Sequence, residues 1–206
     1  MRAAAWRRPL ALVLAVALGA CGWKITPPPP RATTAGPRSV AERVVLQVHG
    51  SGLPWGSGGL GETVREVLTT SGSFREVYYP IEPRNPPPLR LVVTASGTVD
   101  EEIGLGVAKS VIIGLLLFLP VGVIRFNKTY DLTAEVVLLN EGREVKSFRV
   151  ENATEVSHTM FSTMEDYEPA ARKAAFTNLG QQIAWELSTV SIPPSSSTVT
   201  RRRSSG

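Results

Sequence analysis

Hydrophobic positions between residues 40 and 190 alternate with polar ones in some stretches and recur every three or four positions in others. Runs rich in β-branched residues and bounded by glycine or proline predict strands at 42–50 and 88–100, with a short extended piece at 73–80. Alternation after residue 128, followed by the turn sequence "NEG", predicts a β-hairpin over 129–156. The alternating apolar face of its first strand consists of Leu132, Ala134, Val136 and Leu138.

Two segments have the helical period instead. The first covers 59–72 and stops at Gly72, and the second covers 167–190 with Pro169 in its expected first turn. Their apolar stripes are Leu60, Val64, Val67 and Leu68 in the first, and Phe176, Leu179, Ile183 and Leu187 in the second. The element order predicts an α+β fold, a two-layer domain over residues 40–192 with a mostly antiparallel sheet and two helices.

An apolar segment at 103–126 interrupts this pattern. Residues 110–124 form a run of 15 residues without a charge, shorter than the roughly 20 that a spanning helix needs. A single crossing would also separate the strand at 88–100 from the hairpin, and Pro120 breaks the run. Two interpretations remain. The favoured one is an excursion that leaves the domain to meet a bilayer or a partner's apolar groove, and the other is a buried part of the core.

The favoured interpretation assigns membrane or partner contact to the centre of this segment. The expected contact residues are Val111, Ile112, Ile113, Leu115, Leu116, Leu117, Phe118 and Leu119. Lys109 and Arg125 flank the run, as basic residues do at an interface between lipid and water.

The first twenty residues have the three parts of a secretory signal. A basic start (1–8) precedes the apolar run 9–18 and the small residues Gly19 and Ala20. The next residue, Cys21, is the only cysteine in the chain and stands where cleavage of the leader is expected. The opening therefore predicts export.

The sequence "LGAC" (18–21) resembles the bacterial lipobox, in which the cysteine is acylated and becomes the mature N-terminus. The resemblance implies a lipid on Cys21, followed by a proline-rich tether up to residue 39. The alternative is an ordinary cleaved signal with an incidental cysteine. Gly22 stands where an aspartate would suggest retention at the inner membrane, so the expected location is the outer membrane, facing the periplasm.

The charge balance argues against a nucleic-acid partner. The chain carries 22 Lys and Arg against 18 Asp and Glu, but six of the basic residues lie in the leader and the tail. The rest of the chain is therefore slightly acidic and offers no basic face with interleaved aromatics. The tail itself, 193–206, is polar and basic, and we expect it to be disordered.

The sequence contains only weak matches to motifs for nucleotide binding, metal binding or catalysis. The sequence "GSGGLG" (56–61) matches a dinucleotide-binding pattern, but five residues separate it from the preceding strand and no parallel βαβ series follows. It predicts a loop and a helix entry. His49 and His158 lack metal-ligand spacing, and the Ser, His and acidic residues at 151–168 lack a nucleophile elbow. We therefore expect neither an enzyme nor a bound metal or cofactor, with a periplasmic hydrolase as a remote alternative.

The sequence "CGWKI" (21–25) resembles the mature start of the lipopolysaccharide-assembly lipoproteins, and the order of elements in the body is similar. That resemblance implies a non-catalytic lipoprotein that plugs an outer-membrane β-barrel, although the apolar segment departs from the family pattern. The same element order also resembles secretion-channel lipoproteins such as the curli pore subunit, which insert segments into the membrane and oligomerise. Both imply a lipid-anchored accessory component of an envelope complex, with a β-barrel or further copies of itself as partner.

Overall fold

A computed structural model describes residues 22–26, 40–101, 103–115, 124–159 and 162–189. The leader, the expected lipidation residue Cys21, residues 27–39 of the tether, the contact residues Leu116 to Leu119 and the tail 193–206 lie outside these ranges.

Six strands form one sheet. They are β1 (Trp23–Thr26), β2 (Val40–His49), β3 (Phe74–Tyr78), β4 (Leu89–Glu101), β5 (Arg125–Asn140) and β6 (Arg143–Thr159). Their spatial order is β1-β6-β5-β4-β2-β3. The pairings of β1 with β6, β6 with β5 and β5 with β4 are antiparallel, whereas β2 lies parallel to both β3 and β4. The prediction of a mostly antiparallel sheet is confirmed, with a parallel part around β2.

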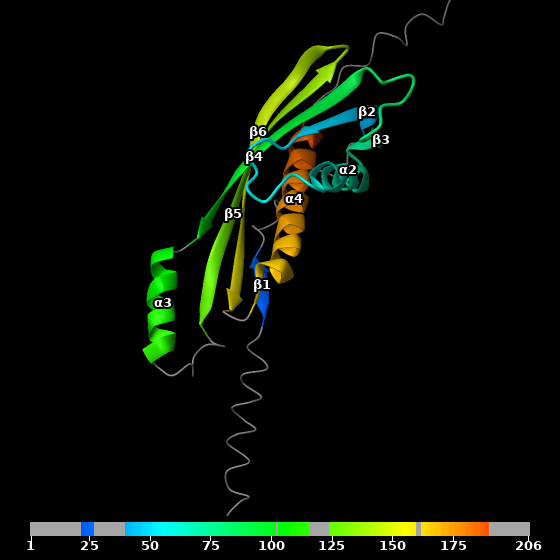
Figure 1. Cartoon of the computed structure of the whole chain (residues 1–206). Helices are drawn as coiled ribbons and strands as arrows, with labels where there is room; N and C mark the ends of the chain where they lie inside the picture. Colours follow the sequence, from blue (N-terminus) through cyan, green and yellow to red (C-terminus); the bar gives the residue numbers. More distant parts are fainter. Residues whose placement is uncertain (1–21, 27–39, 102, 116–123, 160–161, 190–206) are drawn as a thin grey trace, which may run out of the picture.

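Within the described ranges, three helices accompany the sheet: α2 (Leu60–Thr70), α3 (Ile103–Leu115) and α4 (Met164–Ser188). Helices α2 and α4 cover one face of the sheet, which confirms the two-layer architecture, while α3 projects at the end of β4 away from this layer (Figure 1). The two covering helices approach closely, because a Cβ on Gly180 of α4 would lie only 3.0 Å from the Cβ of Val67 of α2. The sequence predicted two helices, and the third one is formed by the apolar segment.

The β5–β6 hairpin follows the sequence pattern closely. All four predicted inward residues of β5, from Leu132 to Leu138, are at most 1% exposed. In the two-residue turn, Glu141 and Gly142 have φ of 52° and 77°. A type I′ turn needs positive φ at both central residues, and glycine at the second one adopts it without strain.

Helix α4 begins earlier than predicted. The sequence placed Pro169 in the first turn, but the helix starts at Met164 and Pro169 lies in its second turn. The reason is the N-terminal cap: Asp166 Oδ2 accepts hydrogen bonds from the Thr163 backbone N–H at 2.9 Å and from its hydroxyl at 2.7 Å. These bonds hold the pKa of Asp166 below its usual value and satisfy a backbone donor that a helix start leaves free.

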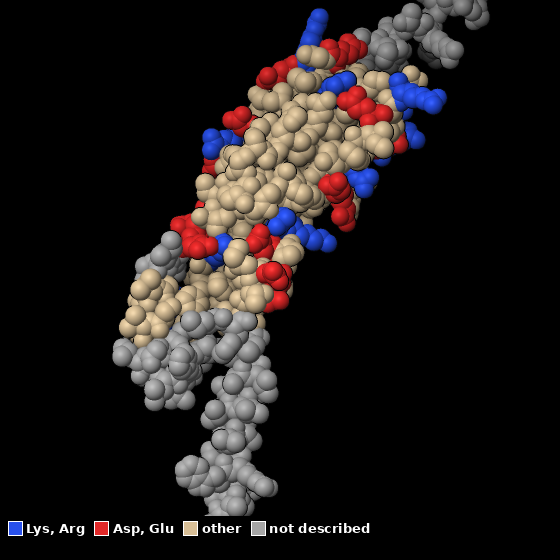
Figure 2. All heavy atoms as spheres, viewed as in Figure 1, with Lys and Arg blue, Asp and Glu red and all other residues tan. Residues whose placement is uncertain are grey.

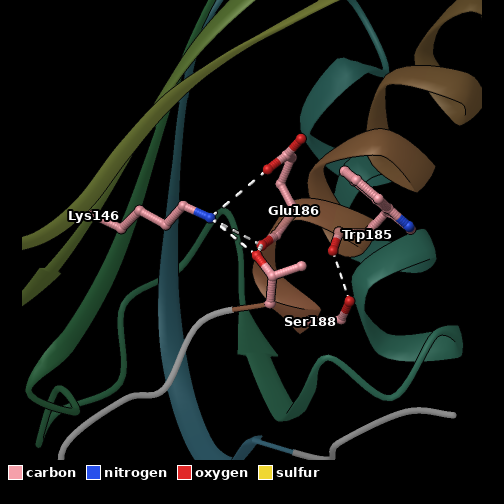
Figure 3. A network of polar contacts seen from close by, with 5 residues as sticks. Lys146, Trp185, Glu186 and Ser188 are labelled. Carbon is pink, nitrogen blue, oxygen red and sulfur yellow. Dashed lines mark hydrogen bonds and ion pairs between the residues drawn. The ribbon is translucent and has the colours of Figure 1, made fainter. Parts of the chain in front are cut away.

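The other end of α4 is tied to β6 by Lys146 (Figure 3). The Lys146 Nζ donates to the carbonyl oxygen of Glu186 and to the hydroxyl of Thr189, both at 3.2 Å, and lies 3.7 Å from the Glu186 carboxylate. A cation at a helix C-terminus complements the partial negative charge of the last carbonyl groups. This contact fixes the helix layer to the sheet at one end of the molecule.

The glycine-rich loop between β2 and α2 serves the fold. Gly56 and Gly59 have φ of 80° and 82°, and Gly61 lies in α2 directly against the ring of Tyr79, where a side chain would clash. Trp55 of this loop is 7% exposed and packs edge-on against Tyr130 at 5.2 Å between ring centroids. The prediction of a loop and a helix entry is confirmed, and Trp55 closes the core.

We predict that Gly97→Ala destabilises the domain by about 1–3 kcal/mol, as overpacking does. A Cβ on Gly97 would lie 2.5 Å from the backbone oxygen of Asp131 and 2.8 Å from the Trp55 ring, and backbone cannot move aside cheaply. Urea unfolding followed by circular dichroism measures the change. Gly58→Ala is the matched control, since no atom lies within 4 Å of its added carbon. Equal midpoints for the two variants would contradict the packing of Trp55 over β4.

Candidate functional site

Exposed apolar side chains gather at one end of the molecule. Among the described residues, the large hydrophobic side chains classed as exposed are Trp23, Ile81, Val107, Val111, Ile112 and Met164. All of them except Ile81 lie where β1 and α4 begin and where α3 projects (Figure 1). We call these five residues the apolar tip.

The sheet places the tip residues next to one another. In the strand register Trp23 pairs with His158, and His158 pairs with Phe126, so the three side chains form a row on one face across β1, β6 and β5. The His158 ring is stacked between Phe126 and Tyr167, with centroids 5.9 Å and 4.8 Å away. Tyr167 comes from the first turn of α4, so this stack fixes the start of α4, and Met164 with it, beside β1.

Helix α3 is attached to this row through its one basic residue. Lys109 Nζ donates to the backbone oxygen of Arg125 at 2.7 Å and lies 5.8 Å from the centre of the Phe126 ring. The charged end of Lys109 is therefore turned toward the sheet. Val107 and Val111, one helical turn apart, remain 61% and 55% exposed, and Ile112 remains 47% exposed.

A cleft of about 710 Å³ separates α3 from the sheet and the start of α4. Its apolar walls include Val107, Val111, Phe126 and Met164. Its charged wall is an ion pair, in which Lys128 Nζ lies 2.7 Å from the Glu101 carboxylate. The Lys128 side chain is 8% exposed and its Nζ also lies 5.7 Å from the centre of the Tyr130 ring. The Lys128 ammonium and the Glu101 carboxylate of the cleft thus already have each other as partners.

Two phenols lie at the bottom of this region. Burial raises the pKa of Tyr130 well above its usual value, and nearby acidic groups add to the effect. Burial likewise raises the pKa of Tyr167, against the opposing effect of Lys128. Both phenols are therefore neutral at physiological pH and contribute packing rather than charge.

The two histidines lie far apart. His49 is the last residue of β2 and pairs with Thr94 of β4. Along the same row of the sheet, Thr94 pairs with Glu135 of β5, and Glu135 pairs with Arg149 of β6. Nine positions on β6 separate Arg149 from His158, which is about 30 Å of strand. Within the described ranges, no group of three or more His, Cys, Asp and Glu side chains could hold a metal ion.

Ser162 lines the cleft together with His158. However, the His158 Nδ1 faces the backbone oxygen of Thr159 at 3.2 Å, and the Ser162 hydroxyl faces the Thr159 hydroxyl at 3.3 Å. These contacts hold the chain between β6 and α4 and do not align a nucleophile with a base.

The predicted contact residues can be placed in part. Val111 and Ile112 are exposed on α3, and their contact with a membrane or partner stays a prediction. Ile113 and Leu115 lie in α3, but their side chains are outside the described set, as are Leu116, Leu117, Phe118 and Leu119 altogether.

The sequence did not point to two members of the tip. Trp23 was assigned to the start of a tether, whereas residues 23–26 form strand β1. Met164 precedes the apolar stripe predicted for the second helix. Trp23 joins the tip through the pairing of β1 with β6, which no local pattern records. Val107 lies inside the predicted apolar segment 103–126, although it was not among the expected contact residues.

At the end that carries the tip, α3 has Lys109 as its one charged residue, whereas the start of α4 carries Glu165 and Asp166 directly after Met164. In the view of Figure 2, acidic and basic residues are spread over the body of the domain, whereas the visible part of α3 is uncharged. None of the helices in the described part of the chain has both the length and the apolarity to cross a bilayer.

Comparisons with known proteins give backbone likenesses only. No family model matches the chain, and no match was found among curated proteins. Solved structures that are similar include a minor lipoprotein from Acinetobacter baumannii, with 14% identity, a TM-score of 0.43 and coverage of 72% of this chain and 94% of that one. Lipoprotein B from Nitrosomonas europaea has 16% identity, a TM-score of 0.38 and coverage of 75% and 88%. The rare lipoprotein B from Shewanella oneidensis has 12% identity, a TM-score of 0.33 and coverage of 69% and 89%. Likenesses of this strength assign this chain neither a family nor an activity.

Proposed function

We propose that the chain is a lipid-anchored lipoprotein of the outer membrane that faces the periplasm and acts as a non-catalytic accessory component of an envelope complex. The observation that carries this proposal is the position of the apolar tip. Strand β1 begins at Trp23, two residues after Cys21, and Trp23 itself belongs to the tip. The expected lipid and the exposed apolar surface are therefore at the same end of the domain.

A non-catalytic role agrees with the chemistry of the cleft. Its charged groups are engaged with each other, as Lys128 is with Glu101, and its histidine is held by aromatic stacking. Groups held in this way position elements of the fold. The resemblance of "CGWKI" to the lipopolysaccharide-assembly lipoproteins makes a β-barrel of that transport system the first partner to look for.

The test is acylation followed by capture of the partner. Cells expressing the chain with an affinity tag after residue 206 are grown with labelled palmitate, and the protein is captured in mild detergent after reversible cross-linking. We expect labelled protein in the outer-membrane fraction and one β-barrel protein captured in a constant ratio. The absence of label would contradict the lipid anchor, and capture of no envelope protein would contradict the accessory role.

A second candidate is a subunit of an oligomeric secretion channel. The exposed apolar surface of α3 favours it, because such subunits insert apolar segments into the membrane next to those of their neighbours. Size measurements in detergent separate the two: a channel subunit gives rings of one size that resist detergent, whereas an accessory protein is monomeric without its partner.

A further inference from the structure

We propose that the apolar tip rests directly on the bilayer that holds the lipid of Cys21, so that the domain stands on this end with the β5–β6 turn pointing away from the membrane. The inference rests on the lipid anchor of the proposed function and names what the tip contacts: the interfacial region of the lipid bilayer and not a groove on a protein.

The first argument is distance. Cys21 precedes Trp23 by two residues, and two residues of extended chain span at most about 7 Å. Trp23 is fixed in the sheet by its pairing with His158. The acyl chains therefore leave the protein from the tip itself, and the short pairing of β1 prevents the body from moving far from the membrane surface.

The second argument is the chemistry of the tip. Trp23 is 41% exposed, and tryptophan is enriched where a protein meets the boundary between lipid and water. Val107, Val111 and Ile112 of α3 are exposed, the first two where the helix lines the cleft, and the charged end of Lys109 is turned toward the sheet. A helix of 13 residues is about 20 Å long, too short to cross the hydrocarbon core. A helix that is apolar on most of its sides is usually buried, and at this end of the domain the bilayer can bury it.

The third argument decides between lipid and protein as the occupant. A surface tethered by a lipid a few ångströms away meets the bilayer at a very high effective concentration, because the second contact is intramolecular. A protein groove would have to displace the tip from lipid that is always present. The tether thus favours the bilayer unless a partner binds the tip strongly.

A fluorophore attached to one introduced cysteine tests whether the tip of the lipidated protein contacts the bilayer. Cys21 is the only cysteine of the chain, and acylation occupies its sulfur, so a new cysteine is the one reactive thiol. Ile112→Cys places an environment-sensitive fluorophore on the tip, and Arg143→Cys places it at the exposed far turn. The purified lipoprotein is reconstituted in vesicles of phosphatidylethanolamine and phosphatidylglycerol that contain nitroxide-labelled lipid. We expect at least fivefold stronger quenching at position 112 than at position 143.

A triple variant, Val107→Ser with Val111→Ser and Ile112→Ser, provides a second measurement, with the fluorophore then on Met164→Cys, a tip position that is not next to Cys21 in the chain. We expect quenching at position 164 to fall at least twofold, with an unchanged unfolding midpoint in urea. The matched control is Ile81→Ser, which removes an 80% exposed side chain remote from the tip and should change nothing.

The outcomes separate this inference from the proposed function. Palmitate incorporation reports the anchor by itself. In labelled protein, equal quenching at positions 112 and 143, or a probe at 112 that remains in water until a protein partner is added, overturns docking on the bilayer and leaves the anchor in place. Stronger quenching at position 112 than at position 143, together with quenching at position 164 that the triple variant lowers, supports docking.

Discussion

Replacing Cys21 with serine should release the mature chain from membranes almost completely. A lipoprotein with two or more acyl chains stays bound to the bilayer, whereas a single chain or a small apolar surface binds marginally and reversibly. The variant is exported with an ordinary cleavable leader, so that an uncleaved signal segment cannot hold it. Fractionation after an alkaline wash should then move it from the membrane pellet to the soluble periplasmic fraction.

The matched control is Thr26→Ser, which keeps the thiol and the length of β1 and should remain in the pellet with its palmitate label. The apolar tip should leave the released Cys21→Ser protein with weak, reversible binding to membranes. The protein should therefore bind added vesicles weakly and be removed from them by a mild salt-free wash. A Cys21→Ser protein that stays in the pellet after the alkaline wash would disprove acylation as the source of anchoring.

The parts of the fold that could be predicted are those whose pattern is local. The alternation from Leu132 to Leu138 requires one buried face over seven residues, and the "NEG" turn fixes the register of the hairpin. The helical stripe from Phe176 to Leu187 is buried along its whole length, between 0% and 2% exposed. In each case the period of the hydrophobic residues and the direction of their side chains are linked by backbone geometry alone.

The parts that were missed depend on contacts between distant segments. Strand β1 has four residues and pairs with the far end of the chain, where Trp23 meets His158 of β6, so its short sequence did not distinguish a strand from a tether. The parallel pairing of β2 with β3 likewise depends on the crossing of α2 between them, and β4 then returns to pair with the other edge of β2. The start of α4 was placed too late because Pro169 matches a first-turn proline, while the Thr163 and Asp166 cap holds a further turn before it.

The candidate site also combines a part with a local sequence pattern and a part that depends on contacts between distant segments. Its apolar segment was visible in the sequence because a long run without charges is unusual in a small domain. The row of Trp23, His158 and Phe126 was not, since it needs β1 to pair with β6 of a hairpin that lies far along the chain. In the described part of the segment, Val111 and Ile112 keep about half of their surface in solvent, which agrees with an excursion, and the contact with lipid or a partner stays a prediction.

Phe176→Ala should cost about 3–5 kcal/mol of the free energy of unfolding, the range for deleting a buried aromatic ring. Phe176 is 1% exposed on the face of α4 that meets the sheet, and its neighbours on the stripe are equally buried. Since domains of this size are stable by only about 5–15 kcal/mol, the variant should unfold at a much lower urea concentration, with the slope of the transition unchanged. Val111→Ala is the control, because an exposed side chain on α3 should change stability by no more than about 0.5 kcal/mol. A Val111→Ala variant as unstable as Phe176→Ala would mean that α3 belongs to the core after all, and the apolar tip would then not be available to a membrane.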